Sequence, residues 1–240
     1  MPRPVPAARR LVRIAVIALV AVGLMLASGC GAGEPRSIDP AGVDGLEIPT
    51  ATPDPADFVS VIDNPRFPLA AGSHWTYESG AITASVTVDD EAREIAGVST
   101  TAASTVVERG GQTETTTRYY AQDRAGNVWS FGADLEGVDE WQAGVTGAQA
   151  GLVMPATPRV GDGFVQQYAA GVAEARSAVL DVAASVSSPY DSWTDAVEIR
   201  ETTALDPTTE AVRFHAPGVG LVRTESSDGV LELVSFTNGP

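Results

Sequence analysis

Three residue types that carry much of protein chemistry are scarce or missing. The 240 residues include no lysine, one cysteine and two histidines. The single cysteine, Cys30, excludes an intramolecular disulfide and a zinc site built from several thiolates. All 15 basic residues are arginines, and they stand against 31 acidic residues, which gives a formal net charge of −16. Because nucleic-acid binding needs a basic surface, this balance predicts no nucleic-acid partner.

The common catalytic motifs are missing as well. The sequence has no Gly-x-Ser-x-Gly elbow, no His-Glu-x-x-His motif, no phosphate-binding glycine loop and no EF-hand loop. The two imidazoles are His74, at a predicted strand start, and His215, shortly before Pro217 at a strand end. A Ser-His-acid triad needs a histidine beside a nucleophile, and the sequence around neither histidine supports one. We expect both to be structural side chains, hydrogen-bonded or exposed.

The first thirty residues have the composition of a secretory signal. Residues 1–13 carry four arginines and no acid, and residues 14–26 form a run of thirteen apolar residues followed by small ones. As a helix the run would reach roughly 20 Å, short of the roughly 30 Å hydrocarbon core, so a permanent transmembrane helix is the weaker interpretation. We predict a signal peptide over residues 1–29.

Cys30 ends this segment. Residues 26–30 (LASGC) resemble the bacterial lipobox, in which small residues precede a cysteine that receives a diacylglycerol group and becomes the mature N-terminus. The resemblance implies lipidation of Cys30 and a palmitate-type anchor in the cell membrane, on its extracytoplasmic face. The alternative is a signal peptide cut elsewhere, with an incidental cysteine. Cleavage would leave 11 arginines against 31 acidic residues. Because anionic lipids repel such an acidic surface, we expect the acyl chains to attach the protein to the membrane.

Downstream of Cys30 the chain divides into a tether and a domain. Residues 30–57 are rich in proline and glycine and poor in large apolar residues. They predict a lipidated cysteine followed by a disordered, extended tether. From residue 58 onward aromatic residues, valine and threonine become frequent, and the hydrophobic period is mostly two. We predict one all-β domain over residues 58–240.

The strand pattern is specific enough to place individual elements. Apolar and polar residues alternate over 82–89, and segments 98–108 and 112–122 flank Arg109-Gly110-Gly111, a hairpin turn whose glycines can adopt positive φ. The window 173–184 suits a strand or a helix. About ten to twelve strands joined by tight turns predict a single antiparallel domain, built as a curved sheet, half-barrel, barrel or sandwich. Later strands are expected near residues 163–170, 174–186, 195–204, 209–216, 219–226 and 229–237, with a turn or short helix over 189–193.

Four acidic residues form the strongest candidate for metal binding. Asp134, Glu136, Asp139 and Glu140 lie close together in the sequence after Trp129. Calcium prefers several oxygen ligands, which loop carboxylates can supply, and paired carboxylates also serve glycoside hydrolysis. Neither spacing is diagnostic, and acidic loop residues are more often only hydrated.

Aromatic residues are the candidates for a ligand pocket. Trp75 and Tyr77 share one face of a predicted strand, and Trp129 and Phe131 share one face of another. Such side chains can line a pocket for an apolar or sugar ligand. They more often fill the core, where each buries roughly 150–250 Å². The core is therefore the expected place of these four residues, and the pocket is the alternative.

Several motifs resemble an uncharacterised family of bacterial secreted proteins and lipoproteins. The resemblance runs from about residue 62 to residue 237 and implies no activity, cofactor or catalytic residue, because we associate no established activity with the family. Ser130 and Ala133 differ from the tyrosine and glutamate that members often carry. The motifs are NPRFPL (64–69) with GxxWxY (72–77), YAQDRAGNVWSFG (120–132), WxAG (141–144), MP (154–155) with VGD (160–162), and APGVGLV (216–222).

Taken together, these features predict a lipoprotein whose β domain binds a ligand or serves as a scaffold without catalysis. Its expected contacts are the membrane, through the lipid anchor, and a small apolar ligand or a protein of the cell envelope. Two alternatives stay open. The domain could carry a lipid or another apolar molecule inside a curved sheet, or it could be a metal-dependent hydrolase that uses the acids of 134–140 with His74 or His215.

Overall fold

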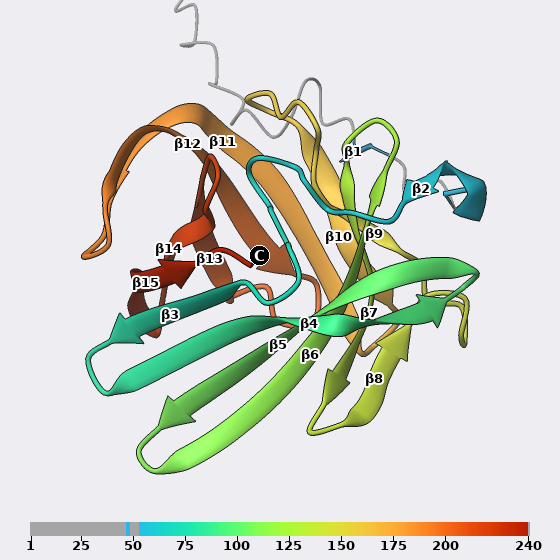
Figure 1. Ribbon diagram of the computed structural model, residues 1–240, viewed down its shortest axis with the longest axis horizontal. Coiled ribbons are helices and arrows are strands. Elements are labelled where there is room, and N and C mark those ends of the chain that lie inside the picture. Colours follow the sequence, from blue (N-terminus) through green and yellow to red (C-terminus); the bar gives the residue numbers. More distant parts are fainter. Residues whose placement is uncertain (1–46, 49–52, 240) are drawn as a thin grey trace, which may run out of the picture. The chain divides into compact units, whose positions relative to one another are not determined.

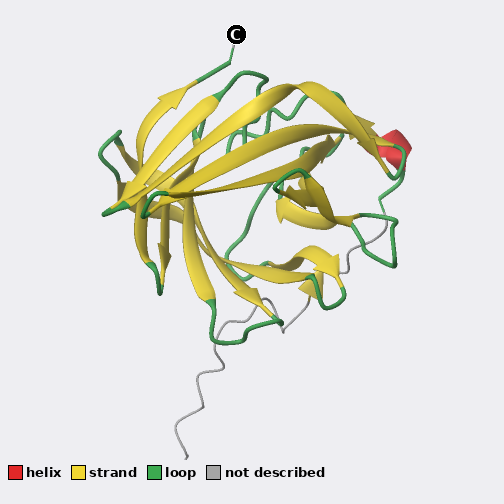
Figure 2. Cartoon of the chain, turned by 90° about the horizontal axis from the view of Figure 1, so that it is seen from below, coloured by secondary structure: helices red, strands yellow, loops and turns green. Residues whose placement is uncertain are grey.

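The computed structural model describes residues 47–48 and 53–239, and in this part of the chain nearly all regular structure is strand (Figure 1, Figure 2). The predicted signal peptide, Cys30 and most of the predicted tether lie outside the described residues. One short 3₁₀ helix, η2 (Pro55–Asp57), precedes the main sheet. No helix within the described ranges is long and apolar enough to span a bilayer. The strands are β1 (Glu47–Ile48), β2 (Phe58–Val59), β3 (His74–Ser79), β4 (Ile82–Ile95), β5 (Val98–Arg109), β6 (Gln112–Asp123), β7 (Val128–Leu135), β8 (Val138–Gln142), β9 (Gly151–Met154), β10 (Gly163–Ala169), β11 (Ala173–Ser187), β12 (Ser192–Thr203), β13 (Glu210–Ala216), β14 (Gly220–Ser226) and β15 (Gly229–Thr237).

The strands form one sheet in which almost every neighbour in sequence is a neighbour in space. Strands β10 to β15 pair in chain order, β15 pairs with β3, and β3 to β8 pair in order again, all antiparallel. The all-β antiparallel prediction is confirmed. The described sheet has fifteen strands instead of ten to twelve, because β1, β2 and β9 have only two to four residues. The first of these lies within the predicted tether and runs parallel to β10.

Local sequence signals placed most strand ends correctly. The turn at 109–111 joins β5 to β6, with Arg109 opposite Gln112 and both intervening glycines at positive φ (58° and 81°). The window 173–184, which also suited a helix, belongs to the 15-residue strand β11. It is a strand because β10 and β12 pair with it on both edges, and this pairing outweighs its alanine content.

The sheet curls until its two ends meet, which makes it a nearly closed barrel. The closing contact is an antiparallel bridge between Gln149 and Tyr168, in which the backbone N–H of Gln149 donates to the carbonyl of Tyr168 at 2.8 Å. Beside it, Gly151 of β9 lies directly on the backbone of β10. A Cβ at Gly151 would be 2.3 Å from the carbonyl carbon of Gln166, so only glycine permits this approach.

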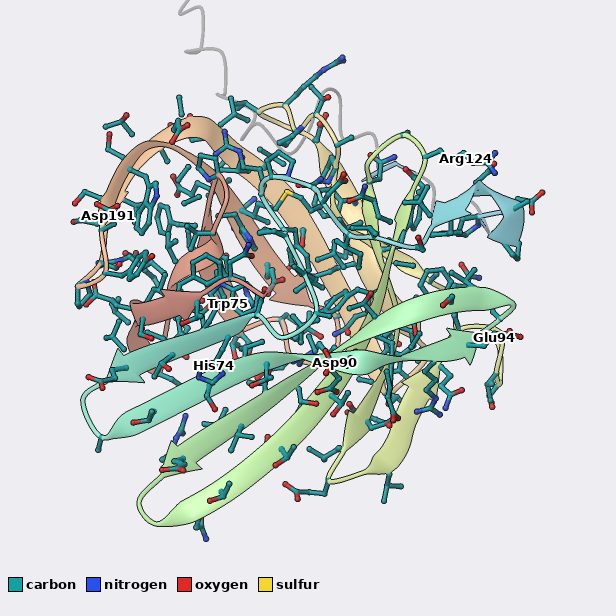
Figure 3. The ribbon with its side chains drawn as sticks, viewed as in Figure 1. His74, Trp75, Asp90, Glu94, Arg124 and Asp191 are labelled. Carbon is teal, nitrogen blue, oxygen red and sulfur yellow. The ribbon has the colours of Figure 1, made fainter. Side chains whose placement is uncertain are left out.

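The largest apolar cluster lies on the inner face of the curled sheet. Alternation decides which side chains reach it, as at the start of β3, where Trp75 points inward and His74 points to the opposite face (Figure 3). Strands β3–β6 and β10–β12 form two walls that face each other across this interior (Figure 1, Figure 2). A second, smaller cluster, which includes Phe131, packs under Phe58 of β2.

Candidate functional site

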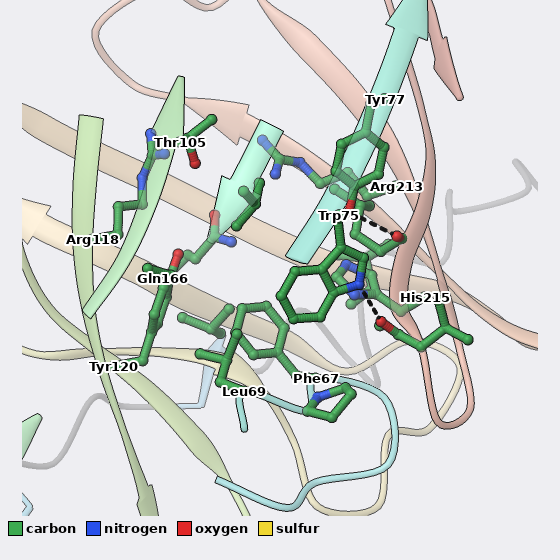
Figure 4. A pocket seen from close by; sticks show the side chains of 18 of the residues that line it. Phe67, Leu69, Trp75, Tyr77, Thr105, Arg118, Tyr120, Gln166, Arg213 and His215 are labelled. Atoms are coloured by element: carbon green, nitrogen blue, oxygen red, sulfur yellow. Dashed lines mark hydrogen bonds between the residues drawn. The ribbon is translucent and has the colours of Figure 1, made fainter. Parts of the chain in front are cut away.

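The interior of the barrel is not completely filled. Between the two walls lies a cavity of about 140 Å³, which we call the interior pocket (Figure 4). Its lining comes from the segment before β3, from strands β3–β6, β9 and β10, and from β12–β14 with the turn before β14. The lining side chains include Phe67, Leu69, Trp75, Tyr77, Val86, Ala103, Thr105, Arg118, Tyr120, Gln166, Glu201, Arg213 and His215.

One end of the interior pocket is apolar and rigidly held. Phe67 packs edge-on against Tyr120, with ring centroids 5.2 Å apart, and stacks on His215 at 5.9 Å. The indole N–H of Trp75 donates to the carbonyl of Val219 at 2.8 Å, which fixes the orientation of the ring. These contacts give the pocket a preformed aromatic wall.

Two tyrosines separate the apolar end from the charged end. The hydroxyl of Tyr77 donates to the carbonyl of Leu221 at 3.0 Å. Burial raises the pKa of Tyr77 and of Tyr120, and the nearby arginines only partly oppose this effect. Both phenols therefore stay protonated at neutral pH and add no negative charge to the pocket.

The other end of the interior pocket carries two guanidinium groups (Figure 4). Arg213 Nε lies 2.6 Å from Glu201 Oε2; the Glu201 side chain is 13% exposed and that of Arg213 is 38% exposed, so water reaches the guanidinium more than the carboxylate. Arg118 is exposed at the rim and has no ion-pair partner among the described residues. Both arginines act to lower the pKa of Tyr120, so both guanidinium groups lie near the side chain of Tyr120. One positive charge at this end is therefore uncompensated.

His215 is a buried, neutral base in the pocket wall. It is 5% exposed, and its Nδ1 has no hydrogen-bond partner within the described part of the chain. Burial and then the Arg213 guanidinium lower the pKa of His215 to about 3, and the backbone of Arg66, which acts in the opposite direction, does not offset them. The imidazole is therefore uncharged at neutral pH, and its Nδ1 is enclosed by protein atoms.

The four predicted aromatic residues divide between the interior pocket and the core. Trp75 and Tyr77 line the pocket although they are 3% and 4% exposed. Phe131 packs against Phe58 with ring centroids 5.1 Å apart, and the indole N–H of Trp129 donates to Asp123 Oδ2 at 2.9 Å. Neither Trp129 nor Phe131 lines the pocket, so their role is to hold the β6–β7 turn and the second cluster in place.

The predicted acidic residues are not brought together with a histidine. Asp134 Oδ2 accepts hydrogen bonds from Arg93 Nη1 at 2.9 Å and from the Tyr119 hydroxyl at 2.6 Å. Glu136 Oε1 accepts the backbone N–H of Thr115 at 2.7 Å. Glu140 is exposed, and the side chain of Asp139 lies outside the described parts. Within the described part of the chain, no group of three His, Cys, Asp or Glu side chains is placed to hold a metal ion.

His74 also lies apart from these acids and from the interior pocket. Its Nδ1 is 2.9 Å from the Thr87 hydroxyl on the outer face of the sheet. Four strand steps separate it from Asp134 in the register, which at ~4.8 Å per step is about 19 Å. The geometry thus gives no support to an acid–histidine centre that uses His74.

Arg118, Glu201 and Arg213 are the residues that sequence reasoning missed. Each is charged but falls on the inward-facing positions of its strand, as Arg118 does two residues before the inward-facing Tyr120. The alternation of inward-facing and outward-facing positions along each strand could have indicated this from the sequence. It could not show that β6 meets β12 and β13 across the interior.

The sequence motifs noted above account for contacts between the segment before β3 and two turns of the sheet. Asn64 Nδ2 donates to the carbonyl of Gly126 at 2.8 Å, and the backbone N–H of Gly218 donates to the carbonyl of Pro65. Asp123 Oδ2 binds both Asn127 Nδ2 and Trp129 Nε1, at 2.8 and 2.9 Å. These motif residues are therefore structural, and through Phe67 and Leu69 they shape the interior pocket.

Comparison with known solved structures yields two matches of low similarity. No protein-family model matches the chain, and no curated protein is significantly similar to it. A predicted exported protein with a YmcC-like fold from Bacteroides fragilis aligns with a TM-score of 0.43 and 13% identity, over 72% of this chain and 98% of that one. A predicted lipoprotein from Parabacteroides distasonis aligns with a TM-score of 0.33 and 12% identity, over the same shares. Similarity at this level does not bear on ligand or activity.

Proposed function

We propose that this chain is a lipid-anchored, extracytoplasmic binding protein that holds a small ligand in the interior pocket and does not transform it. The observation that carries the proposal is the pocket itself, a preformed cavity with an aromatic wall at one end and convergent polar groups at the other. Ligand sites in proteins combine these two features.

Binding is favoured over catalysis by the state of the polar groups in the pocket. The one carboxylate in the lining, Glu201, is held by Arg213, and the one imidazole, His215, is neutral with its pKa at about 3. A general base works best when its pKa lies near the operating pH. The lining therefore presents no free carboxylate and no imidazole tuned to act as a base.

The size of the pocket favours a small ligand over a whole lipid. A cavity of about 140 Å³ is comparable to the ~150 Å³ apolar cavity that accommodates benzene. A molecule with two long acyl chains needs several times this volume. The apolar carrier considered above therefore fits less well than a ligand with one ring or a short chain.

The location part of the proposal is supported by the sequence. Residues 1–29 have the charge and apolar pattern of a secretory signal, and Cys30 follows it in a lipobox-like context. The tether of residues 31–57 would then separate the membrane from the domain. The family motifs likewise support a secreted protein or lipoprotein.

A pair of matched variants tests whether the interior pocket binds ligands. Val86 lines the pocket, whereas Val107 faces the same side of the sheet nearer the β5–β6 turn and does not line it. We expect Val86→Phe to fill the cavity and abolish binding of small aromatic fragments that ligand-observed NMR detects with the wild type. Val107→Phe should bind them unchanged.

A second cavity-filling variant covers the case in which Val86→Phe does not fold. If Val86→Phe does not fold, as judged by circular dichroism, Ala103→Leu fills the same cavity from the neighbouring strand. If no fragment binds the wild type, or if the filled variants bind as well as the wild type, the proposed function is wrong.

A further inference from the structure

We infer that the ligand of the interior pocket is a small anion with an apolar ring or short chain. The inference rests on the proposed function and names the ligand class of the same site. The negative group would bind at Arg118 and Arg213, and the apolar body against Trp75 and Phe67 (Figure 4).

The charge of the interior pocket is opposite to that of the chain. The sequence carries a formal net charge of −16, yet two arginines and one glutamate line this cavity. Because Glu201 binds Arg213, it also holds that guanidinium toward the pocket. A positive group at the mouth of a partly enclosed cavity concentrates anions there, and more strongly than on an open surface, where water screens the charge.

Arg118 is the group that makes this end selective. It is exposed at the rim, and no described residue forms an ion pair with it. Thr105 lies beside it in the lining and offers a hydroxyl (Figure 4). A guanidinium can bind a carboxylate or phosphate through two parallel hydrogen bonds. A cationic ligand would instead meet Arg118 and the Arg213 pair and be repelled.

A second and independent observation comes from the apolar end. Trp75 and Phe67 line the pocket there. The Trp75 indole is fixed by its hydrogen bond to the carbonyl of Val219 at 2.8 Å, and Phe67 by its edge-on contact with Tyr120. An apolar ring or short chain can therefore pack against aromatic faces that are already in place.

The size of the pocket limits the apolar part of the ligand. About 140 Å³ accommodates one six-membered ring or an equally short chain. The shared chemistry is therefore a ring or short chain with a carboxylate or phosphate at one end. It is a free small molecule, since the pocket has no room for the acyl chains of a lipid.

Isothermal titration calorimetry tests the inference by measuring the affinity of four probes. The protein used is the full chain, purified from the cell fraction in which it is found. The probes are 4-hydroxybenzoate, phenyl phosphate, benzoate, and the neutral 4-hydroxybenzamide, which has nearly the shape of the first. We expect 4-hydroxybenzoate to bind at least about tenfold more tightly than the amide, since only the anion gains the charge-assisted contacts. Benzoate should also bind more tightly than the amide, because it carries the same charge as 4-hydroxybenzoate. Comparison with phenyl phosphate shows which anionic group is preferred.

Arginine variants then locate the anion. Arg118→Gln should weaken 4-hydroxybenzoate by about tenfold and leave the amide unchanged, whereas Arg109→Gln, in the exposed β5–β6 turn, should change neither. If the amide binds as well as the anion and Val86→Phe abolishes both, the ligand class is wrong and the proposed function stands. If Arg118→Gln does not weaken the anion, the inference is also wrong. If no probe or fragment binds, the proposed function fails as well.

Discussion

The side-chain carbonyl of Gln122 accepts the backbone N–H of Asn64 at 2.8 Å, although 58 residues separate the two in sequence. The same oxygen accepts the backbone N–H of Asp63 at 3.0 Å, and Gln122 Nε2 donates to Asp63 Oδ1 at 2.6 Å. One buried amide on β6 thus holds the segment that enters the barrel before β3. Because that segment carries Phe67, this contact also sets one wall of the interior pocket.

Replacing Gln122 should therefore loosen the segment and destabilise the domain. In Gln122→Leu the backbone N–H groups of Asp63 and Asn64 lose their acceptor in a buried site. We expect the free energy of unfolding to fall by about 2–4 kcal/mol, measured by urea denaturation. Gln112→Leu, at the exposed β5–β6 turn, is the control and should change it by less than about 0.5 kcal/mol. Equal effects of the two variants would contradict a structural role for Gln122.

The buried neutral His215 predicts a pH dependence of stability. In the unfolded chain this histidine binds a proton below about pH 6.5, whereas in the folded chain its pKa is about 3. The unfolded state therefore binds more protons between these values, and stability falls as the pH is lowered through this window. The contribution is about 1.4 kcal/mol per pH unit.

Urea denaturation between pH 7 and 5 measures this contribution before most carboxylates titrate. The slope of unfolding free energy against pH should be smaller in His215→Gln by about the amount stated above. His74→Gln removes the other histidine, on the outer face, and should keep the wild-type slope. An unchanged slope in His215→Gln would show that His215 is not buried as a neutral group.

Lipidation of Cys30 predicts where the protein is found. In cells supplied with labelled palmitate, the wild type should carry the label and sediment with membranes, because several acyl chains bind a bilayer firmly. Cys30→Ser removes the only thiol in the chain and should lose both the label and the membrane association. If Cys30→Ser still sediments with membranes, another part of the chain holds it there.

Calcium should have no effect on the thermal stability of the protein. Asp134, a buried candidate ligand, is already bound to Arg93 and Tyr119, so a cation would have to displace an existing ion pair. We expect millimolar calcium or a chelator to leave Tm unchanged within error, since only a ligand that binds the folded state raises it. A calcium-dependent rise in Tm that Asp134→Asn removes would contradict this.

Much of the fold could be predicted from alternation and turn chemistry. The β5–β6 hairpin follows from two segments rich in threonine and valine on either side of Gly110 and Gly111. Both glycines have a positive φ, which glycine adopts without strain because it has no Cβ. Short pieces such as β9 could not be predicted, because four buried residues carry no period. The meeting of β9 with β10 depends on Gly151, a contact that nothing local in the sequence indicates.

The site was predictable only in part. Trp75 and Tyr77 were expected on one face of a strand, and they do line the interior pocket. Trp129 and Phe131 carried the same signal, but both contact the second cluster, because they lie on the face of β7 opposite to Val128; Trp129 also touches the largest cluster. Arg118 and Arg213 lie about a hundred residues apart in sequence, and only the curl of the sheet brings them to one cavity.

The amino-acid sequence alone determined the all-β fold class of the domain. A period of two, tight glycine turns and the absence of long amphipathic helices specify antiparallel strands, because those preferences act between residues close in the chain. Whether the resulting sheet would be filled or hollow, and which charges would face its interior, was decided by strand order and closure at Gln149 and Tyr168. Those depend on contacts between distant strands, which the local pattern leaves open.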